Sequence, residues 1–296
     1  MSTISLSAGT VNYQESGPSD GRPLVCVHGY AMGSSLWVPL TERLAARGFR
    51  CIAPTWPLGA HTEPMRKDVE LTMESIAAMI GELVAELGLD DVVLVGNDTG
   101  GAVSQIAAAT TPEWLGALVL TSCDAFEHFP PPILKPFIAA ARFPATFKAA
   151  AQPLRTRIGR KRAYGALAHA DIDSLVVDWL KPGLSDPEIR EDLRRFTASL
   201  NQQSTLRAAD RLPQFTKPAL IAWSEDDAFF PLEDGQRLAA TLPDARLEVI
   251  GGARTFSMID QPDRLAELIA EFAAGGSNGR VESNAAASPD AVRPGT

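Results

Sequence analysis

Short apolar runs alternate along this chain with longer segments whose apolar residues recur at helical spacing. The short runs have the length of buried strands, which is about four to eight residues. Six of them are expected strands: residues 24–27, 51–53, 92–95, 117–120, 219–222 and 246–250. Because strands that alternate with helices are typical of βαβ units, the pattern predicts an α/β fold with a mostly parallel sheet.

Glycine, proline and capping residues mark the ends of the expected helices. A helix over about residues 36–47 is expected to end at Gly48, and the next one to end at Gly88. The last helix has an apolar face with Pro262 in its first turn, so Asp260 is its expected N-cap. Each signal falls between two strand runs or after the last one, as a repeating βαβ chain requires.

The strand pattern disappears between about residues 125 and 212. This stretch opens with three prolines at 130–132 and is rich in Ala, Arg and Leu at helical spacing. We therefore expect a helical cap over residues 125–212, inserted into an α/β core formed by residues 1–124 and 213–274. Residues 275–296 are rich in Gly, Ser, Asn, Ala and Pro without periodicity, which predicts a disordered tail.

Size and charge limit the function classes. The chain has 296 residues, of which 45% are apolar, and one α/β domain with an insertion accounts for this length as well as two domains do. The formal net charge is −9 and the acidic residues form no block, so nucleic acid is not an expected partner. The basic run at residues 155–162 is expected to be a solvated surface.

Cysteines and the N-terminus bear on the compartment. Cys26, Cys51 and Cys123 lie in or beside expected strands and form no spaced framework, so we expect reduced core residues. Residues 1–9 lack the basic and apolar regions of a signal peptide, and no apolar run approaches the roughly 18 residues that a membrane span needs. A cytoplasmic protein with no membrane partner is therefore expected.

Chemically informative residues follow four of the expected strands, at the edge where ligands of open parallel sheets bind. They are His-Gly-Tyr at 28–30, Gly-Asn-Asp-Thr-Gly-Gly at 96–101, the Trp-to-Pro segment at 223–231 and Gly-Gly-Ala-Arg-Thr-Phe at 251–256. The second of these frames a sharp turn from a strand into a helix, with Asp98 at its apex.

These four motifs, in this order, resemble those of the α/β-hydrolase superfamily and, within it, the branch of epoxide hydrolases and haloalkane dehalogenases. The resemblance covers about residues 11–273 and implies the α/β-hydrolase fold. It places Asp98 in the nucleophile position of the elbow and implies that the backbone N–H groups of Tyr30 and Thr99 are the oxyanion donors. It also assigns the catalytic acid to Asp227.

The charge of Asp98 decides its chemistry. A serine in this position needs a neighbouring base, whereas an aspartate is already ionised at pH 7 and can attack an electrophilic carbon unaided. Asp98 therefore suits displacement at an sp3 carbon, as in an epoxide or an alkyl halide, and an alkyl ester of Asp98 results. Hydrolysis of that ester needs a general base and oxyanion donors.

The sequence departs from the family where that base is expected. The hydrolases that it resembles carry Gly-His-Phe or a close variant after the last strand, but here Thr255 stands in the histidine position. Three alternatives remain open. In the first, His61 or His128 replaces the base, while His28 is expected to support the oxyanion loop. In the second, Asp98 acts without ester hydrolysis, in an elimination, isomerisation or cyclisation. In the third, the protein has lost turnover and binds a small ligand under its cap.

Charged neighbours add further alternatives. Arg254 is expected either to bind an anionic group of the substrate or to form an ion pair with Asp227 or Asp98. Asp124 is a reserve for the acid beside Asp227. Asp226 becomes the acid if the preceding strand ends one residue from its expected position.

Other positions bear on the substrate. Haloalkane dehalogenases carry a halide-binding tryptophan after the nucleophile, where this chain has Thr99. Epoxide hydrolases use two cap tyrosines, whereas the expected cap contains only Tyr164, and Tyr30 adds a phenol if its side chain faces the pocket. The residues expected to line an apolar substrate pocket are His28, Trp37, Phe126, Tyr164 and Phe229.

The sequence thus predicts a hydrolase of a small, mostly apolar electrophile of epoxide, alkyl halide or ester type, with an Asp nucleophile and an atypical base. The alternative is a non-hydrolytic lyase, isomerase or cyclase on the same fold, or a lapsed ligand-binding protein. No metal or organic cofactor is implied, because the sequence has neither a ligand cluster nor a phosphate loop. We expect a monomer or homodimer whose partner is a small-molecule substrate.

Overall fold

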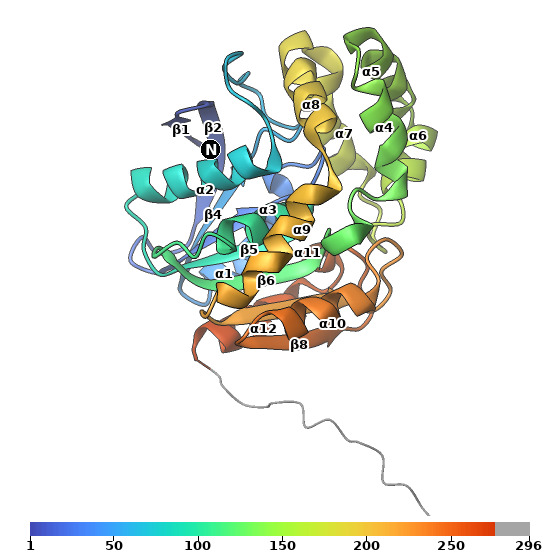
Figure 1. Cartoon of the computed structure of the whole chain (residues 1–296). Helices are drawn as coiled ribbons and strands as arrows, with labels where there is room; N and C mark the ends of the chain where they lie inside the picture. The colour runs from blue at the N-terminus through green and yellow to red at the C-terminus, as the bar shows by residue number, and fades with distance from the viewer. Residues whose placement is uncertain (276–296) are drawn as a thin grey trace, which may run out of the picture.

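A single mixed sheet organises the molecule (Figure 1). The computed structural model describes residues 1–275 and places eight strands in the order β1-β2-β4-β3-β5-β6-β7-β8. The strands are β1 (Ser2–Leu6), β2 (Gly9–Ser16), β3 (Arg22–Val27), β4 (Phe49–Thr55), β5 (Val92–Asp98), β6 (Leu115–Cys123), β7 (Ala219–Ser224) and β8 (Ala245–Ile250). β1 and β2 pair antiparallel, as do β2 and β4, and all the other pairs are parallel.

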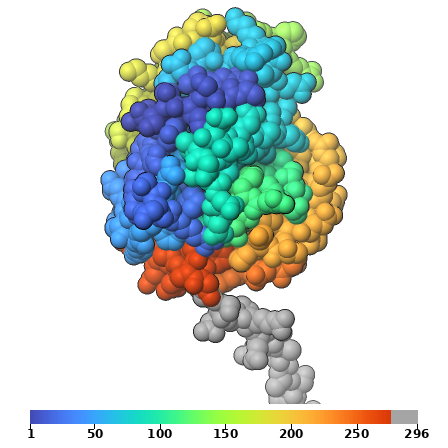
Figure 2. Space-filling model, turned by 90° about the vertical axis from the view of Figure 1, so that its left-hand side faces the viewer, coloured from blue at the N-terminus to red at the C-terminus, as the bar shows by residue number. Residues whose placement is uncertain are grey.

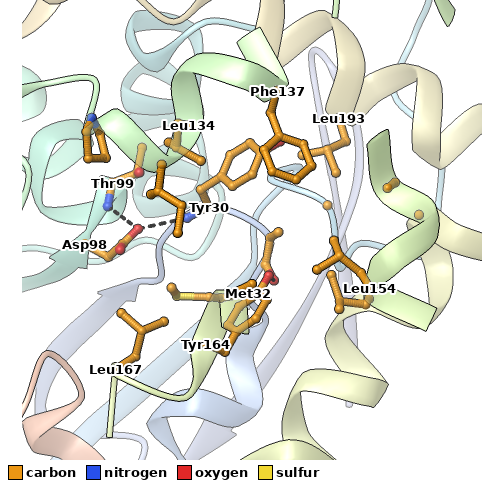
Figure 3. Close-up of a pocket in the computed structure, with 18 of the residues that line it drawn as sticks. Tyr30, Met32, Asp98, Thr99, Leu134, Phe137, Leu154, Tyr164, Leu167 and Leu193 are labelled. Carbon is orange, nitrogen blue, oxygen red and sulfur yellow. Dashed lines mark hydrogen bonds between the residues drawn. The ribbon is translucent and has the colours of Figure 1, made fainter. Parts of the chain in front are cut away.

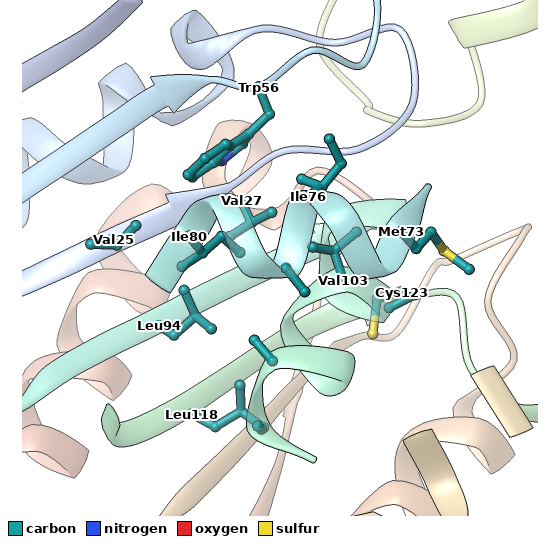
Figure 4. Packing of buried hydrophobic residues seen from close by; sticks show 14 of the residues in the cluster. Val25, Val27, Trp56, Met73, Ile76, Ile80, Leu94, Val103, Leu118 and Cys123 are labelled. Atoms are coloured by element: carbon teal, nitrogen blue, oxygen red, sulfur yellow. The ribbon is translucent and has the colours of Figure 1, made fainter. Parts of the chain in front are cut away.

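Helices cover both faces of this sheet. Those of the core are α1 (Val38–Ala45), α2 (Met73–Glu86), α3 (Thr99–Ala108), α10 (Leu232–Thr241), α11 (Ser257–Asp260) and α12 (Pro262–Ala273). Successive side chains of a strand point to opposite faces, so Val25 and Val27 pack in the cluster that includes α2 and α3, while Leu24 and Cys26 pack in the cluster that includes α1 and α12. Figure 4 shows the first cluster. Burial on both faces explains why these strands read as unbroken apolar runs.

Six α-helices separate β6 from β7, with no strand between them. They are α4 (Lys135–Ala140), α5 (Pro144–Ala151), α6 (Arg157–Tyr164), α7 (Asp173–Ser185), α8 (Pro187–Ser199) and α9 (Gln202–Arg211). Figure 1 shows α4 to α8 gathered to one side of the sheet, whereas α9 returns along the core. We call this group the cap; its division from the core at residues 125 and 212 stays a prediction.

Two sequence-based expectations about elements are wrong. The run at 24–27 is the third strand, because β1 and β2 precede it at the sheet edge, where their partly exposed residues give no continuous apolar run. Figure 2 shows these N-terminal residues, in dark blue, on the outside of the molecule. Asp260 is the last residue of α11, and Gln261 is the N-cap of α12. The Asp260 carboxylate instead accepts the backbone N–H groups of His169 and Arg254.

From residue 276 on, the predicted disordered tail lies outside the described residues. None of the helices within residues 1–275 combines the length and the apolar character that crossing a bilayer requires.

Candidate active site

Asp98 stands at the sharp turn between β5 and α3. Its φ of 54° and ψ of −136° lie in a region that residues with a Cβ rarely adopt, so the turn holds this residue under strain. The neighbouring glycines permit the turn. A Cβ on Gly96 would lie 2.5 Å from the Ser104 Oγ, and one on Gly100 would lie 2.2 Å from the Val27 carbonyl oxygen. Any larger residue at either position would force the turn apart.

One oxygen of Asp98 is held by two backbone donors. Oδ1 accepts the N–H of Thr99 at 2.6 Å and the N–H of Tyr30 at 3.2 Å (Figure 3). These are the two donors that the resemblance implied, although here they bind the Asp98 carboxylate itself. Neither bond uses the second oxygen, Oδ2, which is left to react.

A substitution at Gly29 tests this arrangement, because a Cβ at that position would lie 2.1 Å from the Asp98 Oδ1. We expect Gly29→Ala to push the carboxylate off its two donors and to lower the alkylation rate of Asp98 by about a hundredfold, the cost of a displacement of about 1 Å. The rate is measured by mass spectrometry with a reactive epoxide. Gly81→Ala is the matched control, since a Cβ there meets only the Trp114 Nε1, at 3.8 Å. Equal rates in both variants would show that the donors do not position Asp98.

A second carboxyl group lies beside Asp98. Asp124 directly follows β6, its side chain is buried, and its Oδ2 accepts the hydroxyl of Thr99 at 2.9 Å. Asp98 and Asp124 line the same cavity. Burial raises the pKa of Asp98 to about 6. Burial, reinforced by the charge of Asp98, raises the pKa of Asp124 well above its usual range. Two carboxyls in one apolar site titrate as a pair, so one proton is retained there near neutral pH.

Asp227 and Thr255 face each other behind this pair. The Thr255 hydroxyl donates to the Asp227 Oδ1 at 3.1 Å, and the same oxygen accepts the backbone N–H groups of Phe229 and Phe230. The Asp227 Oδ2 is buried without a hydrogen-bond partner among the described residues. Asp227 is thus directed at the position for which the resemblance implied a histidine. Asp226 points away and pairs with His169 at 2.9 Å, which favours Asp227 over Asp226 as the acid.

None of the chain's four histidines, all of which the structure describes, lines the cavity. The His61 Nε2 lies 3.3 Å from Asp192, and the His128 Nδ1 lies 2.7 Å from Asp234. Both rings are turned to these carboxylates of α8 and α10. The expectation that one of them replaces the base is therefore corrected.

His28 has a structural position. Its Nε2 accepts the backbone N–H of Trp56 at 2.9 Å, so the Nδ1 carries the proton and lies 3.0 Å from the Gly29 carbonyl oxygen. Burial lowers the pKa of His28 to about 4, which keeps the ring neutral. This agrees with a supporting role in the loop, but His28 does not line the pocket as expected.

The guanidinium of Arg254 binds backbone oxygen atoms of the cap. Its Nη1 donates to the carbonyl oxygens of Ala168 at 3.2 Å and Gly165 at 3.4 Å, in the cap. Within residues 1–275 it forms no ion pair with Asp227 or Asp98, and it does not line the cavity. Its guanidinium is occupied by backbone acceptors of the segment that follows α6.

The cavity itself lies between the elbow and the cap and has a volume of about 120 Å³, room for several water molecules or a small organic molecule. Its walls are mostly apolar, from residues such as Met32, Leu134, Phe137, Leu154, Leu167 and Leu193 (Figure 3). Tyr164 and Phe229 line it, as expected. Trp37 and Phe126 do not. Trp37 is buried in the core beside α1, and Phe126 packs under the guanidinium of Arg237 at 3.9 Å.

Two phenols line the cavity, since Tyr30 joins Tyr164 there. The Tyr164 hydroxyl donates to the Ala31 carbonyl oxygen at 3.1 Å. The Tyr30 hydroxyl lies 2.8 Å from the Thr197 Oγ1, and because Thr197 donates to the Leu193 carbonyl, Tyr30 is the donor. Burial raises the pKa of both phenols, so both stay protonated.

Two features of this site were not predicted from the sequence. One is the Thr99 hydroxyl, which bridges toward Asp124; no sequence signal indicated it. The other is Arg190, which lines the cavity. A signal for Arg190 existed, because positions 190, 193 and 197 share one face of a helix and the last two also reach the site. No cluster of three or more potential metal ligands occurs within the described chain.

Comparisons with known proteins agree with this fold. A family model described as alpha/beta hydrolase fold matches residues 22–262. The chain is 28% identical over 270 residues to haloalkane dehalogenase 2 of Mycobacterium tuberculosis, covering 90% of this chain and 92% of that protein. It is 27% identical over 269 residues to 2-hydroxy-6-oxo-6-phenylhexa-2,4-dienoate hydrolase of Burkholderia cepacia, covering 86% and 89%.

Solved structures show the same architecture. A putative ancestral haloalkane dehalogenase superposes with a TM-score of 0.75 at 20% identity, over 93% of this chain and 99% of that one. A thermophilic esterase from Thermogutta terrifontis gives a TM-score of 0.74 at 22% identity, also over 93% and 99%. At such identities the similarity establishes the fold and leaves the chemistry to the residues of the site.

Proposed function

The chain belongs to the alpha/beta hydrolase fold family, and on that premise we propose that it hydrolyses small, mostly apolar electrophiles with Asp98 as the nucleophile. One observation supports this above all. Asp98 stands on the strained elbow with one oxygen bound to two backbone donors and the other free in an apolar cavity. A carboxylate so placed attacks carbon without help from a base.

In the first step the Asp98 Oδ2 attacks an sp3 carbon of the substrate. The new bond joins Oδ2 to that carbon, and the electron pair of the broken bond goes to the leaving oxygen or halide. Oδ1 becomes the carbonyl oxygen of the ester. Since Oδ1 already accepts the N–H groups of Tyr30 and Thr99, ester formation requires no rearrangement of these donors.

In the second step water attacks the ester carbon of Asp98. Negative charge then develops on Oδ1, which the two backbone N–H groups stabilise; one such donor is typically worth about 10² to 10³ in rate. The ester bond from the carbonyl carbon to Oδ2 breaks, and the product leaves with Oδ2. Asp98 keeps the oxygen of the attacking water.

We assign the base of the second step to Asp124. While Asp98 is ionised, like charge favours a protonated Asp124, which can give its proton to the leaving oxygen. Once Asp98 is an ester its charge is gone, so the ionised Asp124 can take a proton from water. That transfer returns Asp124 to its protonated form. When the ester bond breaks, the departing alkoxide takes the second proton of the attacking water, and Asp98 is again a carboxylate. A carboxylate is a weaker base than the imidazole of the relatives, so ester breakdown is expected to be slow.

Among the electrophiles considered, we favour an epoxide. No tryptophan is among the residues that line the cavity, so an indole N–H to stabilise a departing halide is missing there. The carboxyl of Asp124 offers a proton to an opening oxygen, and the protonated phenols of Tyr30 and Tyr164 can do so once they turn from Thr197 and the Ala31 carbonyl oxygen. An epoxide also retains its leaving oxygen, so nothing needs to be expelled from the cavity before hydrolysis.

A single turnover in H2(18)O, with enzyme in excess over styrene oxide, tests the nucleophile. We expect the first diol to contain no heavy oxygen and the peptide with Asp98 to gain one heavy oxygen, because water attacks the carboxyl carbon. Heavy oxygen in the first diol would show that water attacks the substrate directly and that Asp98 acts only as a base.

Asp124→Asn tests the base and the paired titration. In the wild type, alkylation needs ionised Asp98, so the alkylation rate should rise as the pH is raised through about 6 and level off above that pH.

In Asp124→Asn we expect the rate of ester breakdown to fall by about 10² to 10⁴, the usual worth of general base catalysis, while alkylation persists. Both rates come from stopped reactions analysed by mass spectrometry. Asp226→Asn, a surface carboxylate, is the control, and unchanged breakdown in Asp124→Asn would exclude Asp124 as the base.

A second function is favoured by the absence of histidine from the lining of the cavity: a protein that binds a small ligand without turnover. It predicts neither adduct nor diol from any epoxide, together with saturable binding of apolar molecules.

A further inference from the structure

Among residues 1–275, Arg190 is the only cationic side chain that lines the catalytic cavity. It lies in the first turns of α8, and its neighbours in the wall are Gly183, Leu184 and Leu193. Asp98 and Asp124 line the same cavity. The remaining lining is mostly apolar, so one apolar passage contains both the Asp98 carboxylate and the Arg190 guanidinium.

The protein leaves part of this guanidinium unused. The Arg190 Nη1 donates to the carbonyl oxygens of Gly183 at 3.2 Å and Leu184 at 3.4 Å, at the end of α7. Within residues 1–275 no carboxylate pairs with Arg190, and no protein acceptor binds its Nε or Nη2. Capping of α7 therefore accounts for only part of the five N–H groups that a guanidinium offers. The remaining donors suit the two oxygens of a carboxylate.

A surface depression on the cap adjoins this end of the cavity. It shares Phe147 and Arg190 with the cavity wall and adds Lys148, Glu191 and Arg194. Arg194 pairs with Glu191 at 2.5 Å, whereas Lys148 is exposed and forms no ion pair in the described chain. The depression thus has three cations and one carboxylate on a chain whose formal net charge is −9. Such a local excess attracts anions to this side of the cavity.

We propose that Arg190 forms a carboxylate-binding subsite, so that the cavity takes an apolar electrophile that carries a carboxylate at the end remote from its reacting carbon. The apolar passage holds the hydrocarbon part, and Arg190 fixes the orientation that points the reacting carbon at Asp98. This names the substrate class of the proposed function and rests on that function for its chemistry. The subsite itself can be tested without any reaction.

Calorimetric titration with octanoate and octan-1-ol is the test, because neither molecule alkylates Asp98. We expect octanoate to bind the wild type more tightly than octan-1-ol. Arg190→Gln should weaken octanoate binding by about ten- to a hundredfold, the usual worth of hydrogen bonds to a charged group, and change octan-1-ol binding less than about threefold. The octanoate affinity of Arg190→Lys should lie between those of the wild type and Arg190→Gln, because lysine keeps the charge but not the paired donors.

Arg162→Gln is the matched control, because it removes one positive charge from an exposed position of α6. Its octanoate affinity should equal that of the wild type. Retained octan-1-ol binding shows that each variant keeps a folded cavity. Any of three results would overturn the subsite. Arg190→Gln loses affinity equally for both ligands, Arg190→Gln binds octanoate as tightly as the wild type does, or the wild type does not bind octanoate. An Asp98 that resists alkylation would remove the proposed function, and the octanoate result would be unaffected.

Discussion

Asp98→Asn is expected to lower the turnover of any true substrate by at least about a thousandfold, because an amide carries neither the charge nor the nucleophilic oxygen that forms the ester. The side chain keeps its size, and its oxygen can still accept the N–H groups of Thr99 and Tyr30, so the elbow should remain folded. Steady-state diol formation from styrene oxide measures the effect, and thermal unfolding reports stability.

Two controls make this result interpretable. Deamidation restores the aspartate, so the mass of each preparation must show the amide intact. Asp226→Asn removes a carboxylate that pairs with His169 away from the cavity, and it should retain full turnover. Turnover of Asp98→Asn at the wild-type rate, with the amide intact, would falsify the role of Asp98.

Thr255→His is expected to speed the breakdown of the Asp98 ester by about 10² to 10⁴, because it returns an imidazole base to the position that the family uses. Asp227 is ready to orient such a ring. Its Oδ1 already accepts the Thr255 hydroxyl at 3.1 Å, and its Oδ2 is buried with no hydrogen-bond partner in the part of the chain that the structure describes. An imidazole N–H directed at that oxygen would also satisfy a buried acceptor. Single-turnover kinetics of the labelled enzyme measure the breakdown.

The double variant Thr255→His, Asp227→Asn separates orientation from simple basicity. It should lose most of the gain, because an amide does not stabilise the imidazolium that forms as the ring takes a proton. A gain of the same size with and without the Asp227 carboxylate would show that Asp227 does not act on position 255. No gain in Thr255→His, in a variant that remains folded, would show that the ring does not reach the ester.

The sequence predicted the parts of the site that backbone geometry controls. Asp98, Thr99 and Tyr30 lie where their motifs placed them, because an elbow between a strand and a helix, and a loop after the neighbouring strand, leave little freedom to the main chain. The parallel strands were recognisable because both of their faces are buried. β1 and β2 were missed because an antiparallel edge with one exposed face shows no such run.

Side-chain directions were less predictable. His61 and His128 follow strands of the expected sheet, but each turns to a carboxylate on a helix distant in sequence, Asp192 or Asp234. Arg254 likewise turns to carbonyl oxygens of the cap. Such pairings depend on how the cap helices pack on the core, which local periodicity does not encode. The same holds for Arg190, whose place in the wall needs the contact of α7 with α8.

Intact-protein mass spectrometry during exposure to styrene oxide tests the central claim, that Asp98 attacks carbon, most directly. The wild type should gain the mass of one epoxide, mapped to the peptide with Asp98, because no histidine assists the breakdown of the ester. Asp98→Ala should gain none, and Asp124→Asn should accumulate more than the wild type. Diol formation by Asp98→Ala at the wild-type rate, or a label on another residue alone, would contradict the claim.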